Sequence, residues 1–215
     1  MSAVVEVGLR EGLASLGLSL AEGQVAQLLA YLQLIQKWNK VYNLTAVRDP
    51  SEMLAHHLLD SLAVVGPLRR HSQGQGLDFL DVGSGAGLPG VVVAICCPEF
   101  RVDCIDAVAK KAAFVRQVAA ELKLPNLRGL HGRVESLRQE YAVISCRAFA
   151  SLADFVAWSA AALAPQGVWL AMKGKSPAAE IAELPAQVDV FHVEQLQVPG
   201  LNAERCIVWM KRRAA

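Results

Sequence analysis

From residue 77 onward the chain alternates between short apolar runs of strand length and longer segments whose apolar residues recur at helical spacing. Strands are predicted at 77–82, 101–106, 127–131, 142–146, 168–173, 188–198 and 206–211, and helices at 88–97, 110–123, 153–163 and 178–184. This alternation predicts an α/β fold with a mostly parallel, seven-stranded sheet covered by helices on both faces. The last two strands follow each other without a helix, so we expect one of them to run antiparallel.

The first third of the chain has the pattern of helices only. Ser19 and Glu22 have capping-box spacing, and apolar residues follow at helical intervals up to residue 35. A second helix is predicted to start with Asp49 as N-cap and to end at Gly66-Pro67. Its predicted apolar face comprises Met53, Leu54, Leu58 and Leu62.

The run HSQGQG at 71–76 is the predicted boundary between the helical part and the alternating part. We therefore expect a helical N-terminal extension at 1–70, packed on a main α/β domain at 71–215. A chain of 215 residues suits one such domain with a modest extension. A composition of 53% apolar and 19% charged residues is ordinary for a globular enzyme with a buried sheet.

Several classes of protein are disfavoured by composition. No apolar run has the length of a membrane span, and acidic residues stand early in the chain, where a secretory signal has a basic region. The five cysteines lack C-x-x-C spacing and predict reduced, mostly buried thiols, with neither disulfides nor a metal site. From these features we expect a cytoplasmic protein. The net charge of +1 by itself gives no support for a nucleic-acid partner.

The stretch LDFLDVGSGAGLPG at 77–90 satisfies two incompatible cofactor patterns. The glycines at 85, 87 and 90 fit the G-x-G-x-x-G loop of dinucleotide-binding proteins. Asp81, Gly83, Gly85 and Gly87 fit instead an acidic-x-G-x-G-x-G pattern, which suits S-adenosylmethionine (AdoMet).

Two physical arguments favour AdoMet. If Gly83 ends the strand, the glycine that packs helix against strand in a dinucleotide fold is replaced by Leu88, which is too large for that contact. The carboxylate of Asp81 would repel a pyrophosphate, whereas it could bind the ammonium group of AdoMet. Asp106 ends the next strand, where a carboxylate accepts hydrogen bonds from ribose hydroxyls. Since both cofactors contain adenosine, Asp106 does not discriminate between them, and a helix cap is its alternative role.

Five stretches at characteristic spacing identify a family. They are WNKVYNLTAVRDPSEMLAHHLLDSLAVV at 38–65, LDVGSGAGLPG at 80–90, GRVESL at 132–137, CRAFASL at 146–152 and MKGK at 172–175. Together they closely resemble the bacterial small-subunit ribosomal RNA methyltransferase G family, also called glucose-inhibited division protein B. The resemblance implies a Rossmann-like class I AdoMet-dependent methyltransferase that modifies N7 of one guanine in 16S rRNA. One departure is Ala142, where family members commonly have an aspartate; we expect only a local packing change there.

The resemblance also implies a set of site residues. The family's cofactor contacts fall on Gly83, Leu88, Val134, Glu135 and Arg147. Leu88 and Val134 are apolar and suit the apolar faces of the ligand, and Glu135 suits the adenine edge. Arg147 follows a strand at the edge of the sheet where ligands bind, and could hold the methionine carboxylate, an RNA phosphate or the guanine.

Methylation at N7 removes no proton, so we expect positioning and electrostatics, by Arg147 and Lys173, without a general base. Lys173 ends the fifth strand and is predicted to face the substrate. For His57 and Asp60 a hydrogen bond on the helix surface and a place in the RNA site are equally open. Arg69-Arg70 and the run 211–213 are further candidates for phosphate contacts.

The expected partner is 16S rRNA or the 30S subunit, bound by a monomer with no membrane contact. Three alternatives remain: a methyltransferase for another RNA or a small molecule, an NAD-dependent oxidoreductase, and a non-catalytic RNA-binding module. The substrate rests on the resemblance alone.

Overall fold

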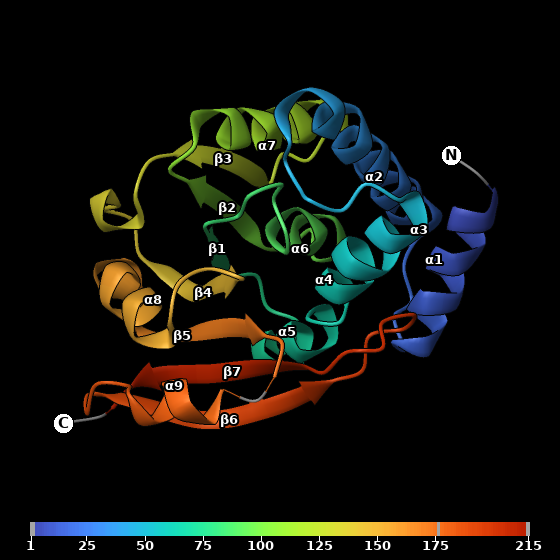
Figure 1. Ribbon diagram of the computed structural model, residues 1–215. Coiled ribbons are helices and arrows are strands. Elements are labelled where there is room, and N and C mark those ends of the chain that lie inside the picture. The colour runs from blue at the N-terminus through green and yellow to red at the C-terminus, as the bar shows by residue number, and fades with distance from the viewer. Residues whose placement is uncertain (1–2, 176, 214–215) are drawn as a thin grey trace.

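The fold is built on one sheet, and the computed structural model describes residues 3–175 and 177–213. Its strand order is β3-β2-β1-β4-β5-β7-β6 (Figure 1). Strands β1 to β5 are parallel, and β7 runs antiparallel to both β5 and β6. The predicted mostly parallel sheet with an antiparallel end is confirmed. The strands are β1 (Asp78–Val82), β2 (Arg101–Asp106), β3 (Leu127–His131), β4 (Tyr141–Arg147), β5 (Leu163–Lys173), β6 (Val188–Leu196) and β7 (Arg205–Arg212).

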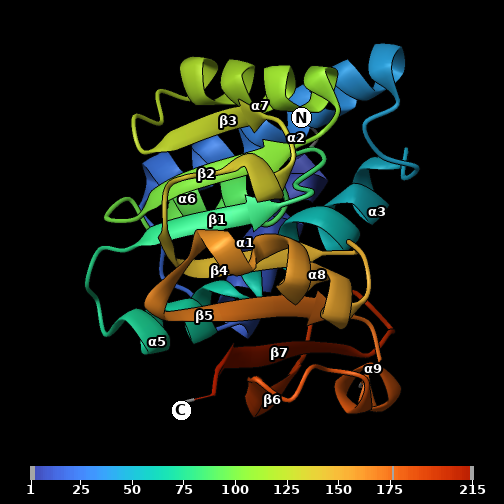
Figure 2. The same ribbon diagram turned by 90° about the vertical axis from the view of Figure 1, so that its left-hand side faces the viewer.

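Helices cover both faces of this sheet (Figures 1 and 2). Apart from the short helix α9 (Ala178–Ala182), the helices that connect parallel strands are α6 (Gly90–Cys96), α7 (Ala109–Glu121) and α8 (Leu152–Ser159). The N-terminal helices are α1 (Ala3–Ser15), α2 (Glu22–Tyr42), α3 (Pro50–Met53), α4 (Asp60–Leu62) and α5 (Val65–Ser72). Short elements complete the set: the π-helical turn η1 (Leu54–Leu59), the 3-10 turns η2 (Val134–Ser136) and η3 (Ala160–Ala162), and α9 (Ala178–Ala182).

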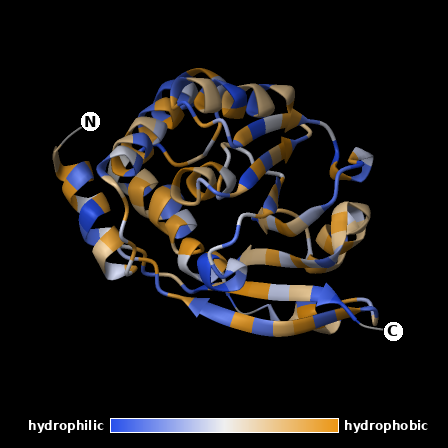
Figure 3. Ribbon diagram, turned by 180° about the vertical axis from the view of Figure 1, so that it is seen from behind, coloured by the Kyte–Doolittle hydropathy of each residue, from blue (hydrophilic) through white to orange (hydrophobic). Residues whose placement is uncertain are grey.

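The alternation of side chains along the strands divides the core into two layers. On β1, Phe79 belongs to the cluster beneath α2, α6 and α7, whereas its neighbour Leu80 belongs to the cluster beneath α8. Figure 3 shows hydrophobic residues along the strands and the helices that pack on them. All five cysteines are buried, as predicted. Among the described residues, no helix is long and apolar enough to cross a membrane.

Two predicted features of the N-terminal part are wrong. Helix α2 begins after Ala21, whose N–H donates to Oε1 of Gln24 at 3.0 Å, so the capping interaction lies two residues beyond Ser19. Gly66-Pro67 lies in the first turn of α5, which begins at Val65, and does not end a helix. Proline fits the first turn of a helix, because an N–H there has no intrahelical partner.

Other N-terminal predictions are confirmed. Oδ1 of Asp49 accepts the N–H of Glu52 at 3.0 Å, as expected of an N-cap, and the predicted apolar face is buried. The division of the chain near residue 70 stays a prediction. Helix α5 continues to Ser72, and the N-terminal helices share one apolar cluster with α6 and α7.

Polar side chains of α2 also bind the backbone of the α/β part. Nε2 of Gln24 donates to the carbonyl oxygen of Ile95 at 2.7 Å, and Nε2 of Gln27 donates to that of Leu122 at 2.9 Å. The hydroxyl of Tyr31 is fully buried and donates to the carbonyl oxygen of Ala86 at 2.6 Å. Helix α2 is therefore fixed to the glycine loop between β1 and α6.

We predict that Tyr31→Phe lowers the free energy of unfolding by about 1–3 kcal/mol, because it leaves the buried carbonyl of Ala86 without this donor. Urea denaturation of both proteins measures the difference. Tyr42→Phe is the matched control, since Tyr42 is exposed and the same change should cost little there. Equal effects of the two substitutions would contradict this account of α2.

Candidate functional site

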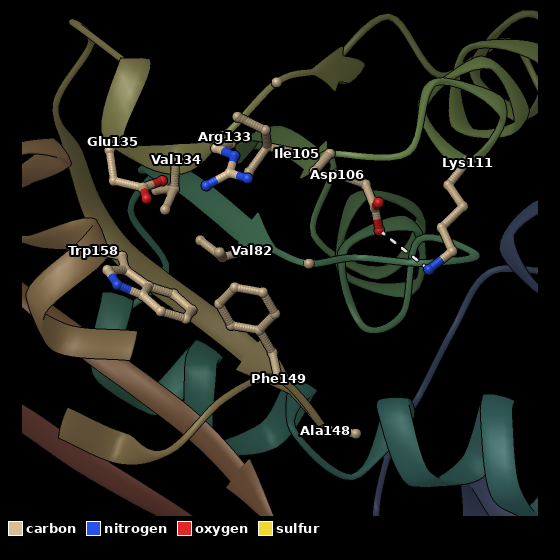
Figure 4. Close-up of a pocket in the computed structure, with 13 residues that line it drawn as sticks. Val82, Ile105, Asp106, Lys111, Arg133, Val134, Glu135, Ala148, Phe149 and Trp158 are labelled. Carbon is tan, nitrogen blue, oxygen red and sulfur yellow. Dashed lines mark ion pairs between the residues drawn. The ribbon is translucent and has the colours of Figure 1, made fainter. Parts of the chain in front are cut away.

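A cavity of about 440 Å³ opens at the carboxyl ends of β1, β2, β3 and β4. Figure 4 shows its side chains converging from the segments that follow these strands. Apolar walls come from Val82, Ile105 and Val134, and polar groups from Asp106, Arg133 and Glu135. This is the edge at which parallel α/β sheets bind their ligands.

The glycine loop forms one side of the cavity through Gly83, whose φ of +65° favours glycine. Gly83, Gly85 and Gly87 all have positive φ, which explains why three glycines follow β1. The N–H of Gly85 donates to Oδ2 of Asp106 at 3.0 Å. Gly87 is buried, and of the three only Gly83 lines the cavity.

Asp81 lies beneath the loop and does not line the cavity. Its side chain is fully buried, with Oδ2 accepting the N–H of Gly90 at 2.9 Å and Oδ1 accepting the hydroxyl of Ser145 at 3.2 Å. Burial raises the pKa of Asp81 to about 7, against the opposing effects of the Gly90 N–H and the positive charge of Arg147. In this structure Asp81 therefore holds the loop, and its contact with a ligand's ammonium group stays a prediction.

Leu88 is also placed differently from the prediction. It is buried in the apolar core and is not part of the cavity lining. The glycine that allows close packing of helix on strand is Gly90, where a Cβ would lie 2.3 Å from Sγ of Cys104 and 3.0 Å from Cβ of Asp81. A packing glycine is therefore present, so neither Leu88 nor the buried Asp81 separates AdoMet from a dinucleotide on physical grounds.

The predicted contact of Asp106 with ribose hydroxyls stays a prediction, and its alternative role as a helix cap is wrong, because Val108 is the N-cap of α7 and has no side-chain cap. Asp106 lines the cavity, and Oδ1 accepts the N–H of Val108, just before α7, at 2.8 Å. Nζ of Lys111 lies 3.7 Å from Oδ2 (Figure 4). Each carboxylate oxygen has two lone pairs, so the backbone bonds leave Asp106 able to accept ligand hydroxyls.

Val134 and Glu135 lie on η2 and line the cavity, and the cofactor contacts that the resemblance implies for them stay a prediction. The sequence reasoning missed other lining residues, among them Lys111, Arg133 and Trp158. Lys111 and Trp158 stand on helices that follow β2 and β4, so their places could have been inferred from the predicted strand order. Arg133 lies inside the quoted GRVESL stretch, next to Val134.

Phe149 packs directly over Gly83. A Cβ at Gly83 would lie 2.3 Å from Cδ2 of Phe149, whose ring also meets Trp158 edge to face at a centroid distance of 5.8 Å. The flanking Ala148 and Ala150 have φ of +52° and +47°. Left-handed backbone at alanine costs about 1 kcal/mol or more per residue, so this loop holds a strained conformation over the cavity.

Arg147 is held by a carboxylate of the N-terminal part. Its Nη1 donates to Oδ2 of Asp60 at 2.8 Å and to the carbonyl oxygen of His56 at 2.9 Å. Oδ1 of the same Asp60 accepts Nε of Arg205 at 2.8 Å. One buried carboxylate therefore binds two guanidinium groups, which leaves this cluster of three side chains with one net positive charge. Of the two roles left open for Asp60, a hydrogen bond on the helix surface is wrong, because the residue is only 4% exposed.

The two remaining candidates have partners within the fold. Nε2 of the buried His57 lies 2.8 Å from the hydroxyl oxygen of Thr45, and burial together with Arg147 lowers the pKa of His57 to about 4. Nζ of Lys173 binds both carboxylate oxygens of Glu180, at 2.8 and 3.1 Å. Glu180 also accepts the N–H of Leu152, so this ion pair fixes the start of α8.

The suggested phosphate-binding arginines also bind elsewhere in the fold. Arg69 donates to the carbonyl oxygen of Cys96, and Arg212 to that of Ala160, each at 2.7 Å. Arg70 pairs with Glu194. Nζ of Lys211 lies 3.9 Å from Oδ2 of Asp189, and the backbone N–H of Arg213 donates to the carbonyl oxygen of Gln187. In the described part of the chain, no group of three or more His, Cys, Asp or Glu side chains is arranged to hold a metal ion.

Solved structures share this fold. TrmN from Thermus thermophilus matches with a TM-score of 0.57 and 19% identity, covering 74% of this chain and 53% of that one. Coclaurine N-methyltransferase bound to N-methylheliamine and SAH matches with a TM-score of 0.55 and 12% identity, covering 90% and 73%. Sheet order, helices and cavity position together define a Rossmann-like class I methyltransferase fold.

Sequence comparison identifies the family. The pattern of the rRNA small subunit methyltransferase G family matches residues 24–208. The ribosomal RNA small subunit methyltransferase G of Polaromonas sp. (strain JS666 / ATCC BAA-500) is 67% identical, covering 98% of this chain and 95% of its own. That of Acidovorax sp. (strain JS42) is 66% identical, covering 96% and 95%. The chain belongs to the rRNA small subunit methyltransferase G family.

The buried carboxyl group of Asp81 predicts a pH-dependent stability. Because the pKa of Asp81 is raised in the folded state, the folded protein binds a proton that the unfolded chain releases, and stability falls as pH rises from about 4 to 7. Asp81→Asn removes this ionisation. We expect the unfolding free energy of the variant, relative to the wild type, to be higher at pH 7 than at pH 5 by about 2 kcal/mol.

Urea denaturation at the two pH values measures this difference. Asp189→Asn is the matched control, because Asp189 lies partly exposed on the edge strand β6 and should show the same difference at both. A pH-independent difference for Asp81→Asn would contradict the buried, proton-binding carboxyl group.

Proposed function

We propose that the protein transfers the methyl group of AdoMet to N7 of a specific guanine in 16S rRNA. The observation that carries the proposal is membership of the family over residues 24–208, combined with a cavity at the edge of the sheet where its fold binds ligands. The rivals are a methyltransferase for another RNA or a small molecule and, less well supported, an NAD-dependent oxidoreductase.

The residues of the cavity fit AdoMet. Asp106 would accept the ribose hydroxyls, since its carboxylate lines the cavity at the end of β2. Val134 and Ile105 would enclose the adenine, and Glu135 on η2 lies where a carboxylate could accept its amino group. AdoMet supplies a methyl group bonded to a positively charged sulfur atom.

Gly83 is the proposed contact for the methionine part, because its backbone lacks a side chain. Phe149 now covers Gly83, so we propose that the strained loop at 148–150 shifts when AdoMet binds. Release of the left-handed conformations of Ala148 and Ala150 would offset part of the cost of that shift.

The chain's contribution to the chemistry is positioning and charge. Guanine N7 has a lone pair and no proton, so no general base is needed, and the buried Cys146, whose pKa is raised by burial, is no candidate nucleophile. Arg147 keeps its proposed role, since Asp60 fixes it beside the loop at 148–150. Lys173 is a weaker candidate, because Glu180 neutralises it. We further propose that the protein works as a cytoplasmic monomer on the 30S subunit or free 16S rRNA.

Incubation with labelled AdoMet and 30S subunits, free 16S rRNA or unrelated RNA tests the proposal. We expect label in ribosomal RNA only, at one guanine, located by strand cleavage selective for 7-methylguanine. Label at another atom, or only in unrelated RNA, would refute the N7 assignment. A protein that binds NADH more tightly than AdoMet would refute the cofactor.

Gly83→Ala should weaken AdoMet binding by about tenfold or more, because a Cβ there lies 2.3 Å from Phe149 and projects toward the proposed methionine site. Isothermal titration calorimetry measures the dissociation constant. Gly17→Ala is the matched control: Gly17 has the same φ of +65°, and a Cβ there meets no atom within 4 Å. Both variants bear the same backbone strain, so equal AdoMet affinity in the two would remove Gly83 from the site.

A further inference from the structure

A second hollow, of about 420 Å³, lies between the end of α2 and the end of α3. It is lined by Gln36, Asn39, Lys40, Asn43, Arg48 and Met53. Two of these residues are cations and three are amides, and no acid is among them. Nε2 of Gln36 is buried and has no hydrogen-bond partner among the described residues. The lining therefore offers mainly hydrogen-bond donors and positive charge, which suit an anion.

An exposed aromatic residue, Tyr42, lies in the sequence between Lys40 and Asn43, which line this hollow. Tyr42 is 41% exposed, and its ring centroid lies 5.0 Å from that of Trp38. Trp38 in turn contacts Phe114 of α7 edge to face, at 5.2 Å. The ring of Tyr42 is thus supported from the core while much of its surface remains open, which is the arrangement of a platform for stacking a base.

The segment that carries Arg48 has a defined shape. Oδ1 of Asn39 accepts the N–H of Thr45 at 2.9 Å, and Nδ2 of Asn39 donates to the carbonyl oxygen of Val47 at 3.2 Å. The hydroxyl of Thr45 is joined to His57 on η1. Residue Asp60, which follows η1 directly, holds Arg147. The hollow and Arg147 are therefore both connected to the buried segment that contains His57 and Asp60.

The position of this surface suits a long substrate. In Figure 2 the end of α2, the segment after it and α3 project on the side to which β1 and β2 point, the side on which the cavity opens. From Lys37 to Arg48 the sequence contains three cations and no acid. Asp49 and Glu52 begin the next helix, with Asp49 capping it.

We propose that the α2 end surface, defined by Gln36, Lys40, Tyr42, Asn43 and Arg48, binds a single-stranded RNA segment that flanks the methylated guanine. Lys40 and Arg48 hold phosphates, Gln36 and Asn43 donate hydrogen bonds, and Tyr42 stacks on a base. The inference rests on the proposed function for the identity of the RNA. Its charge and its exposed aromatic ring favour a nucleic acid over a protein partner.

The test measures RNA binding separately from catalysis. The probe is a fluorescein-labelled single-stranded oligouridylate, whose anisotropy is followed at several salt concentrations. We compare the wild type with Tyr42→Ala, Tyr42→Phe and the double variant Lys40→Gln/Arg48→Gln. The matched control is Lys123→Gln, an exposed lysine just beyond the end of α7.

Tyr42→Ala should raise the dissociation constant about tenfold, and Tyr42→Phe should leave it near the wild-type value because the ring is kept. The double variant should also raise it about tenfold and reduce the salt dependence by about 1.4 in log–log slope, as expected for two lost phosphate contacts on a single strand. KM for 16S rRNA should rise in parallel, while AdoMet affinity stays at the wild-type value and all variants remain folded at the assay temperature.

Oligouridylate affinity and salt slope equal to those of Lys123→Gln would overturn the proposal. So would equal losses of RNA and AdoMet affinity, which would indicate a structural role, or intact RNA binding with lost binding of purified small-subunit ribosomal proteins. If the variants lose RNA affinity as expected but the wild type methylates no ribosomal RNA, the surface stands and the proposed function fails.

Discussion

The candidate site depends on hydrogen bonds that buried side chains make to the backbone of the glycine loop and of the first residue of α6. Asp81 binds the N–H of Gly90, Asp106 binds that of Gly85, and Tyr31 binds the carbonyl of Ala86. These three side chains come from β1, β2 and α2, so the left-handed turns of the loop depend on the way these three elements pack together. The loop is in this sense a product of the whole fold, and glycine supplies only the freedom to adopt it.

The N-terminal helices belong to this arrangement in two ways. Through Tyr31 they support the loop on the cofactor side, and through Asp60 they hold Arg147 and Arg205 at the carboxyl edge. A buried carboxylate between two guanidinium groups is costly to desolvate, and it is compensated here by direct hydrogen bonds to both. The same helical part also presents the α2 end surface. We therefore regard it as part of the proposed active centre, with one role toward the cofactor and another toward the RNA.

Local patterns predicted the strands, the antiparallel end of the sheet and the place of Asp106. Strand length, turn glycines and strand ends depend on residues that are close together in the sequence. Local patterns did not predict the interactions of side chains whose partners are far away in the sequence. The pairing of Arg147 with Asp60 and of Lys173 with Glu180, and the burial of Asp81, depend on elements that meet only in the folded chain. Gly90 shows the consequence. It packs on Cys104, so Leu88 does not disfavour a dinucleotide, and the proposal of AdoMet rests on family membership.

The central claim is that the cavity between Gly83, Asp106 and Val134 binds the methyl donor. A crystal structure with S-adenosylhomocysteine, the demethylated product, tests it most directly. The account predicts density for adenosine between Ile105 and Val134, the ribose on Asp106, and Phe149 displaced from Gly83. Ligand bound elsewhere, with Phe149 still packed on Gly83 and the cavity empty at saturating ligand, would contradict it.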